Sequence, residues 1–234
     1  MVDWNDTQVK LWVYLIYGTS FIIMFLALTF WRNRVSHIEL MNDFKYLAAF
    51  GLLHGLAEYS DIPRFLVWEP AWAFDLIKLI LVSSSFAALL AFGVNVISAG
   101  LEERRWIRGI PVGALIMYFW LLIFAGLDLS NNDLGINYTV ADLAQRYSLC
   151  FLGAAISSYA FLELSGKMTA VVGGRAGRRF MYAGIGLALY AVFGGLIVNP
   201  FFGIPPVIFR SAIAVLITIS VIWLFRLFRV KQSK

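Results

Sequence analysis

The chain has 234 residues, of which 61% are hydrophobic and only 14% are charged. Its mean hydropathy is +0.79, whereas soluble domains carry about 25% charged residues, so an ordinary soluble domain is excluded. The single cysteine, Cys150, excludes an intramolecular disulfide and a metal site built from several cysteines. The net charge of +5 does not indicate nucleic-acid binding, because the basic residues gather in loops on one side of the predicted bundle.

Apolar segments long enough to cross a membrane recur along the whole sequence. A spanning helix needs about 20 mostly apolar residues, since it rises 1.5 Å per residue through a hydrocarbon core of roughly 30 Å. We therefore predict an all-α, polytopic membrane protein with one domain over residues 1–234. Its seven transmembrane helices are expected at approximately 11–31, 44–62, 71–97, 106–127, 143–164, 180–198 and 207–228.

The first two segments have individual features. The first is not expected to be a cleavable signal peptide, because its apolar run is too long, Asp3 and Asp6 precede it in place of basic residues, and no small-residue cleavage site follows. The second is the weakest of the seven, because Glu58 and Asp61 interrupt its far end.

Basic residues near the helix ends predict the orientation, since Lys and Arg accumulate in cytoplasmic loops. Fourteen of them follow the first, third, fifth and seventh helices: Arg32, Arg34, Lys45, Arg104, Arg105, Arg108, Lys167, Arg175, Arg178, Arg179, Arg226, Arg229, Lys231 and Lys234. The opposite side has only Lys10 and Arg64. The N-terminus is therefore predicted outside and the C-terminus in the cytoplasm. These basic loops need no ligand to explain them.

Seven ionisable side chains stand out inside the predicted helices: His54, Glu58, Asp61, Asp75, Lys78, Arg146 and Arg210. Each costs about 2.5–3.5 kcal/mol in a membrane helix, so each needs a partner or a function. Spacings of three and four residues place those of the second helix on one face, and those of the third helix likewise. Counted from the outer helix ends, all seven lie in one layer of the outer leaflet.

This charged layer has two interpretations. Its three acids and three bases balance, which describes a self-neutralising network that fastens four helices together. Buried ion pairs often fail to recover their desolvation cost, however, so stability alone does not require it. The second interpretation is a polar cavity open to the outside, in which Arg146 and Arg210 bind an anionic headgroup or carboxylate and His54 makes occupancy pH-dependent. We predict all seven side chains as ligand-binding and none as catalytic.

Three short motifs resemble those of a known group of membrane sensors. Residues 54–61, HGLAEYSD, look like a His-Gly-x-x-Glu-aromatic-x-Asp motif. Residues 146–154, RYSLCFLGA, resemble an Arg-Tyr followed by Phe-x-Gly-Ala, and residues 204–210, IPPVIFR, are similar to a Val-Pro-x-x-x-Phe-Arg pattern. Together they resemble, over essentially the whole chain, the seven-helix N-terminal sensor region of some bacterial sensor histidine kinases and diguanylate cyclases.

The resemblance implies a receptor in the bacterial inner membrane that reads a small ligand from outside and signals through the seventh helix, as in two-component systems. It carries onto His54, Glu58, Asp61, Arg146 and Arg210. Asp75 and Lys78 rest on their place in the charged layer alone. The sequence ends at Lys234 without a kinase or cyclase domain. We therefore expect a non-enzymatic chain that is either an excised sensor module or works through a cytoplasmic partner.

Other function classes fit these residues less well. A retinal protein usually carries its Schiff-base lysine on the last helix, whereas Lys78 is on the third. His37 in a cytoplasmic loop and His54 in the outer layer cannot share a metal or a haem. The serines at 83–85 have no histidine predicted at their depth. A proton-coupled carrier is the strongest competitor, although its relay would stop at mid-membrane, and a lipid- or quinone-binding subunit of a larger complex stays open.

The expected mechanism couples ligand binding to the seventh helix. A ligand engages Arg146 and Arg210, breaks one of two alternative pairings with Glu58, Asp61 and Asp75, and shifts or rotates the helix. Unequal affinity for the two pairings is what drives the shift. Membrane lipids, a small molecule and a cytoplasmic signalling domain or partner are expected; nucleic acid, a cofactor and a metal are not. Because two output domains have to meet, we also expect a homodimer.

Overall fold

The computed structural model describes residues 6–34, 39–63, 71–99, 102–128, 135–136 and 138–229. Its elements in chain order are α1 Thr7–Arg34, α2 Glu39–Tyr59, α4 Ala71–Ser98, η1 Glu102–Gly109, α5 Ile110–Gly126, β1 Leu127–Asp128, β2 Gly135–Ile136, α6 Tyr138–Gln145, η3 Arg146–Cys150, α7 Phe151–Val171, α8 Gly174–Tyr190, η4 Ala191–Leu196 and α9 Pro206–Arg229. The two strands are a two-residue antiparallel pair. The predicted all-α fold is confirmed.

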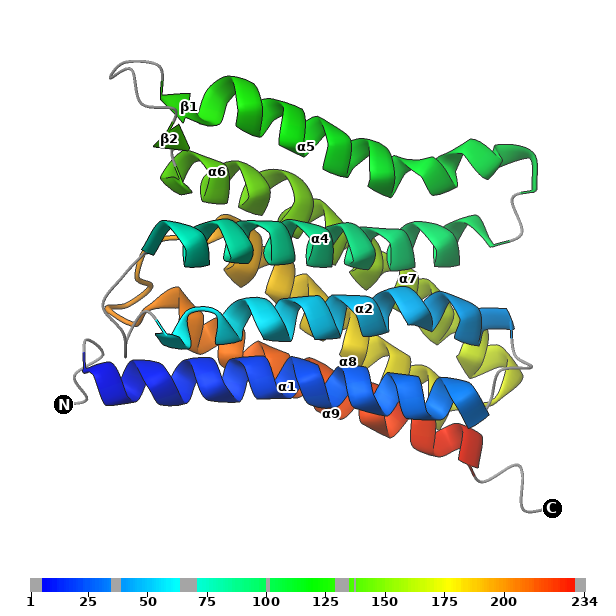
Figure 1. Ribbon diagram of the computed structural model, residues 1–234. Coiled ribbons are helices and arrows are strands. Elements are labelled where there is room, and N and C mark those ends of the chain that lie inside the picture. The colour runs from blue at the N-terminus through cyan, green and yellow to red at the C-terminus, as the bar shows by residue number, and fades with distance from the viewer. Residues whose placement is uncertain are drawn as a thin grey trace.

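Two of the long helices contain a widened turn. α6, η3 and α7 follow one another without a break, as do α8 and η4, and both η3 and η4 are π-helical. The helical part of the described chain therefore forms seven long segments (Figure 1). Single π turns inside α-helices are frequent at functional sites.

Six of these segments close into a ring. Around it, each segment packs against the next in the order α1, α2, α4, α7, α8 and α9, and α9 returns to α1. α5 lies outside the ring, against α4 and α6, at the edge of the bundle (Figure 1). α1 begins at one end of the bundle and α9 finishes at the other (Figure 1). The end where α1 begins and η4 finishes is called the site end below.

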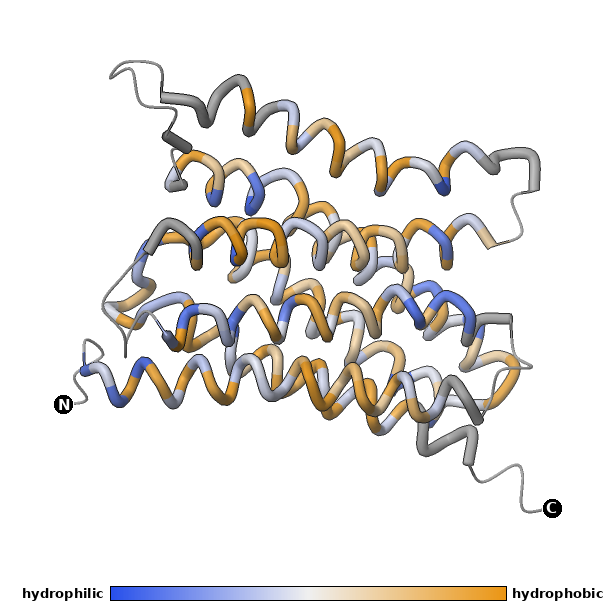
Figure 2. The backbone as a smooth tube through the Cα atoms, viewed as in Figure 1, coloured by the Kyte–Doolittle hydropathy of each residue, from blue (hydrophilic) through white to orange (hydrophobic). Residues whose placement is uncertain are grey.

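Five of the segments are long and apolar enough to cross a membrane. They are Thr7–Trp31, Phe74–Ser98, Thr139–Val171, Gly174–Leu196 and Pro206–Leu224. Figure 2 shows apolar residues along most of their length and hydrophilic residues gathered toward the two ends of the bundle. Many large apolar side chains face outward, as a lipid-facing surface requires.

The helix ends differ from the predicted ones. The second helix is Glu39–Tyr59 instead of 44–62, so it begins five residues earlier and ends three residues earlier than predicted. The fifth is one continuous helix over 138–171, longer at both ends than the predicted 143–164. Hydropathy marks only the apolar stretch of a helix, whereas the hydrogen-bonded helix continues into the polar interface.

The core far from the site end is aromatic. The rings of Phe44, Phe92, Phe161 and Phe180 follow one another across the ring of helices, with neighbouring centroids between 5.1 Å and 6.2 Å apart. Gly93 lets α4 approach α7 closely, because a Cβ there would lie 2.8 Å from a backbone nitrogen of α7. Small residues serve this purpose in membrane bundles.

Hydroxyl groups also join the helices. Ser157 on α7 donates to a carbonyl of α4 at 2.6 Å, and Ser158 to a carbonyl of α8 at 2.7 Å. Thr218 on α9 donates to a carbonyl of α1 at 2.9 Å. Such bonds fix the order of the ring and position the polar residues of the site end.

Candidate functional site

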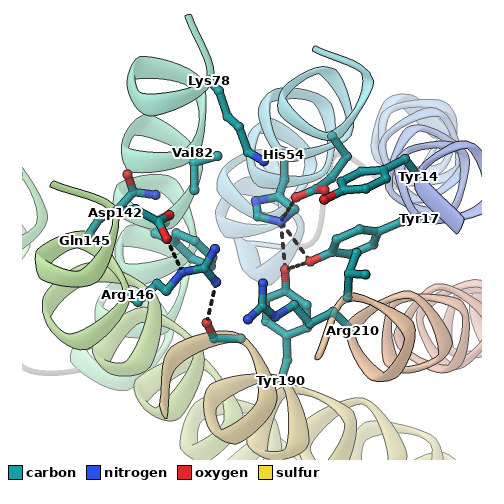
Figure 3. A pocket seen from close by; sticks show the side chains of 14 residues that line it. Tyr14, Tyr17, His54, Lys78, Val82, Asp142, Gln145, Arg146, Tyr190 and Arg210 are labelled. Atoms are coloured by element: carbon teal, nitrogen blue, oxygen red, sulfur yellow. Dashed lines mark hydrogen bonds and ion pairs between the residues drawn. The ribbon is translucent and has the colours of Figure 1, made fainter. Parts of the chain in front are cut away.

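An enclosed polar cavity lies between the helices toward the site end (Figure 3). Its volume is about 60 Å³, whereas one water molecule needs roughly 10–15 Å³ of such space, so the cavity has room for a few waters. Its lining residues are Tyr14, Tyr17, His54, Glu58, Lys78, Val82, Phe86, Asp142, Gln145, Arg146, Tyr190, Gly194, Val207 and Arg210.

His54 is the centre of a buried hydrogen-bond network. Its Nδ1 lies 2.9 Å from the Oγ of Ser85, and the Ser85 hydroxyl donates its single proton to the Val82 carbonyl at 2.7 Å. With its proton on the Val82 carbonyl, Ser85 accepts from His54, and we therefore assign the imidazole proton to Nδ1. The Nε2 atom faces the hydroxyls of Tyr190 at 2.7 Å and Tyr17 at 3.3 Å.

This network corrects one expectation about the serine run at 83–85. We expected no histidine at its depth, but His54 bonds directly to Ser85. The contact does not create a nucleophile, because the imidazole donates to the hydroxyl, and the serine proton is held by a carbonyl. Ser85 positions the histidine.

Phenylalanines close the cavity on the side away from the site end. The rings of Phe21, Phe50 and Phe86 lie 4.9 Å, 5.2 Å and 5.1 Å from the imidazole of His54. All three are buried. The polar residues therefore meet an apolar layer at His54, close to the depth at which the sequence places the end of the charged layer.

Glu58 on α2 and Asp61, in the turn that follows α2, have different partners. Glu58 lies 3.4 Å from Nε2 of His54, measured from its Oε1. Asp61 is buried and forms an ion pair with Lys78 of α4. The ammonium of Lys78 also lies 5.8 Å from the ring centroid of Tyr14 on α1. A buried ion pair must offset a large desolvation cost, so the Lys78–Asp61 pair adds little net stability. We attribute its role to aligning the end of α2 with α4.

Arg146 connects η3 to η4. It donates through Nε to Asp142 at 2.6 Å and through Nη1 to the carbonyl of Gly194 at 3.1 Å. Close by, η4 approaches the first residue of α7 at Gly195, where a Cβ would lie 2.9 Å from that of Phe151. The guanidinium therefore joins the two π-helical turns, with its charge balanced by a carboxylate on its own helix.

Arg210 holds the same turn from α9. It donates through Nε to the carbonyl of Phe193 at 2.8 Å and through Nη2 to that of Ile197 at 3.1 Å. Carbonyls at the C-terminal end of a helix have no intrahelical partner and carry partial negative charge. Arg210 and Arg146 therefore cap η4 together. In these bonds each uses two of its five N–H donors, and the remaining ones can bind an anion.

A second, open groove of about 590 Å³ lies beside the arginines. It shares Asp142, Arg146, Val207 and Arg210 with the enclosed cavity. Its other walls come from α6, η3, the segment that joins η4 to α9 and the first residue of α9: Thr139, Leu143, Tyr147, Val198, Asn199, Pro205 and Pro206. The arginines thus stand between a water-sized cavity and a groove with the volume of a small-molecule site.

The structure brings most of the predicted site residues together. The enclosed cavity is lined by five of the seven: His54, Glu58, Lys78, Arg146 and Arg210. Asp61 is next to it, as the partner of Lys78. Asp75 is half-buried on α4, three residues before Lys78, and lines neither the cavity nor the groove.

The pairing of the arginines differs from the expected one. We expected Arg146 and Arg210 to pair with Glu58, Asp61 and Asp75. In the structure Arg146 pairs with Asp142, and Arg210 donates to backbone carbonyls. The layer therefore divides into an α2–α4 group of charges and a separate pair of arginines bound to η4.

Sequence reasoning missed several residues of the site. Tyr14, Tyr17, Tyr190 and Gln145 line the cavity but are uncharged, so a search for intramembrane charges does not find them. Asp142 lies one residue before the predicted fifth helix at 143–164. Its spacing of four residues from Arg146, with opposite charge, is the one signal that identifies it.

No protein-family model, curated protein or solved structure matches this chain. Over the ranges that the structure describes, no group of three or more His, Cys, Asp or Glu side chains is placed to hold a metal ion. His37 lies outside the described residues. The residues around Arg146 and Arg210 are hydrogen-bond donors and acceptors, and they suit a small polar or anionic group.

Proposed function

We propose that this chain is a seven-helix membrane sensor module that binds a small anionic group at Arg146 and Arg210 and signals through α9. In this proposal all seven segments cross the inner membrane of a bacterial cell, with the N-terminus outside and the C-terminus in the cytoplasm. The module is non-enzymatic and acts on a cytoplasmic output domain or partner.

The connectivity of the bundle supports seven crossings. α2 is not among the five segments that are apolar enough by themselves, but it runs alongside α1 and α4, both of which are long and apolar enough to cross (Figure 1). α5 is short, but α4 finishes at one end of the bundle and α6 starts at the other (Figure 1), so η1 and α5 have to traverse it. The start of α1 and the finish of α9 at opposite ends require an odd number of crossings.

The basic residues support the orientation. Among the exposed cations in the described part of the chain, Arg108, Lys167, Arg175 and Arg178 lie near helix ends remote from the site end. Since Lys and Arg favour the cytoplasmic side, the site end faces outward. The open groove is then accessible from the outside or from the outer leaflet.

The observation that carries the proposal is the position of Arg146 and Arg210. Both are half-buried, both bind carbonyls of one irregular turn, and both face a groove large enough for a small molecule. Planar guanidiniums bind carboxylates and phosphates through paired hydrogen bonds. An anion in the groove competes directly with the η4 carbonyls and with Asp142 for these donors.

This competition provides a route to α9. Arg210 lies near the start of α9 and attaches it to η4, while Thr218 attaches the middle of α9 to α1. A ligand that draws Arg210 toward the groove releases the first attachment and leaves the second as a pivot. The shift follows from unequal affinity of the ligand for the attached and released states.

The test is binding of defined anions to the purified full chain. Inorganic phosphate, acetate and succinate are titrated by calorimetry at low salt, with the wild type and Arg146→Gln. Loss of a charge-assisted hydrogen bond costs about 1.5–3 kcal/mol, so we expect affinity to fall roughly tenfold or more. Lys10→Gln, which removes one positive charge from α1 near the same end, is the matched control and should leave affinity nearly unchanged.

Two results would overturn the proposal. In one, none of the three anions binds at concentrations up to about 10 mM, a binding free energy weaker than about 3 kcal/mol. In the other, Lys10→Gln weakens binding as much as Arg146→Gln does, which would reduce the effect to surface charge.

A proton-coupled carrier is the second candidate, because Glu58, His54, Tyr17 and Tyr190 form a continuous polar chain. The phenylalanines around His54 argue against it, since they separate this chain from the cytoplasmic half of the bundle. Proton flux into liposomes that contain the purified chain decides between the two. Flux that disappears in Glu58→Gln would establish the carrier and refute the sensor.

A further inference from the structure

A second basic site lies at the start of α8, far from the cavity and the groove. Arg175, Arg178 and Arg179 line a pocket of about 380 Å³ together with Tyr182 and with Trp223 of α9. In the described part of the chain, the ion pairs join other residues and none involves these three arginines. The pocket therefore presents positive charge that no carboxylate of that part neutralises.

The pocket is on the opposite side of the membrane midplane from Arg146 and Arg210, which are called the outer arginines below. Arg178 and Phe193 lie on one continuous helix, fifteen residues apart, which corresponds to about 22 Å at 1.5 Å per residue. Phe193 is the residue whose carbonyl binds Arg210. In the proposed orientation, the pocket is level with the cytoplasmic headgroups.

The pocket lies at one end of the long contact between the antiparallel helices α8 and α9. This line of contact is called the seam below. Arg179 donates to the carbonyl of Trp223. Further along, a Cβ on Gly186 would lie 2.8 Å from the side chain of Ile217, and at the far end Arg210 binds α8–η4. The two helices therefore stay in register over the whole distance.

Apolar side chains continue from the pocket along this seam. On α8, Ile185 and Leu189 follow Tyr182 at helical spacing, and on α9, Ile219 and Leu216 precede Trp223 at helical spacing. These six side chains are between 40% and 54% exposed. Both faces that line the pocket therefore extend as an apolar surface toward the middle of the membrane.

We infer that this pocket binds the phosphate headgroup of an anionic phospholipid, whose acyl chains lie along the apolar seam between α8 and α9. Basic residues at a cytoplasmic surface are ordinary by themselves. Here three arginines converge with an interfacial Tyr and Trp in one pocket, and an apolar seam leads from it into the hydrocarbon. That combination matches a headgroup with attached chains, and it matches a soluble phosphate less well. The inference does not depend on ligand binding at the outer arginines.

The test uses the purified full chain and two lipids of equal chain length, neutral phosphatidylcholine and anionic phosphatidylglycerol. Native mass spectrometry measures how much phosphatidylglycerol stays bound. The variant Arg175→Gln/Arg178→Gln removes two exposed arginines of the pocket and keeps the Arg179–Trp223 bond. Each such residue is worth a factor of about five near an anionic surface, so we expect a loss of roughly thirtyfold.

The matched control is Arg108→Gln/Lys167→Gln, which removes the same charge from exposed positions at the same end of the bundle and should retain the lipid like the wild type. Equal losses in both double variants would overturn the inference, because bulk surface charge would then explain binding.

A second experiment measures the binding of the soluble compounds glycerol phosphate and inorganic phosphate to the wild type, which should be far weaker than that of the lipid. Equally tight binding of either would assign the pocket to a soluble ligand and overturn the lipid. If the double variant does not fold, Arg178→Gln against Arg108→Gln decides in the same way, with a loss of about fivefold expected.

Discussion

Replacing Arg210 by methionine should loosen α9 from η4. Methionine keeps the apolar stem but loses the two donors that bind the carbonyls of Phe193 and Ile197. Hydrogen bonds that involve a charged group contribute about 1.5–3 kcal/mol each. Because both acceptor residues are half-buried and water can partly replace the donors, the lower value applies to each. We expect the free energy of unfolding to fall by about 3 kcal/mol.

Cys150 makes this loss measurable. It is the single cysteine of the chain, it is buried, and it lies in η3, where its Sγ would be 3.2 Å from a Cβ on Gly194. A thiol-reactive fluorogenic dye therefore reports the separation of η3 from η4 as the protein is heated. A loss of about 3 kcal/mol corresponds to a fall of roughly 6–12 °C in Tm for a chain of this size.

The control is Arg108→Met, the same chemical change at an exposed position on η1, which should leave the labelling midpoint within about 1–2 °C of the wild type. A midpoint for Arg210→Met equal to that of the wild type would refute the reasoning, since the two carbonyls would then not depend on Arg210. An equal fall for Arg108→Met would attribute the effect to lost charge.

Further predictions concern packing and polar contacts. Gly93→Ala should lower stability by about 1–3 kcal/mol, because the new Cβ meets the α7 backbone, whereas Gly113→Ala, with nothing within 4 Å, should raise it by about 0.5–1 kcal/mol; thermal unfolding of the two variants side by side checks the opposite signs. Ser85→Ala leaves the buried imidazole Nδ1–H without its acceptor and should cost about 1–3 kcal/mol, read from the same thiol-labelling midpoint. Asp142→Asn frees Arg146 from its competing carboxylate and should raise the affinity for inorganic phosphate up to about fivefold in calorimetric titrations; a fall in affinity would contradict the competition.

The helices of this fold can be predicted from sequence, because a helix satisfies its backbone hydrogen bonds internally and needs only a long apolar stretch to cross a membrane. This is why 71–97 and 207–228 agree closely with α4 and α9. We predict seven such stretches, and in the described part of the chain five segments are long and apolar enough to cross a membrane. α2 is not one of these five, because the polar residues near its two ends lower the mean hydropathy of the helix.

The ring order of the helices could not be read from the sequence. It depends on close approaches such as that of Gly93 to α7 and on hydroxyl bonds such as that of Ser157 to α4. Each is a single contact between segments far apart in the chain. No periodicity of the apolar residues encodes which helix faces which.

The charged members of the site were predictable, and their partners were not. A charge inside an apolar helix is conspicuous, which identified Arg146 and Arg210. Apart from Asp142, their partners are backbone carbonyls of η4 and of Ile197 directly after it, and a carbonyl carries no sequence signal. The π-helical turn at Arg146 adds a further obstacle, because an inserted residue changes the direction in which the following side chains point.

The most direct test of the account is the response of the two guanidiniums to an anion. Nitrogen-15 signals of arginine Nε are recorded for the full chain in lipid nanodiscs and assigned by their absence in Arg146→Gln and Arg210→Gln. On titration with inorganic phosphate, acetate and succinate in turn, both signals should shift together along one saturating curve with at least one of these anions. Signals that stay constant with all three while an exposed arginine such as Arg108 responds would contradict it.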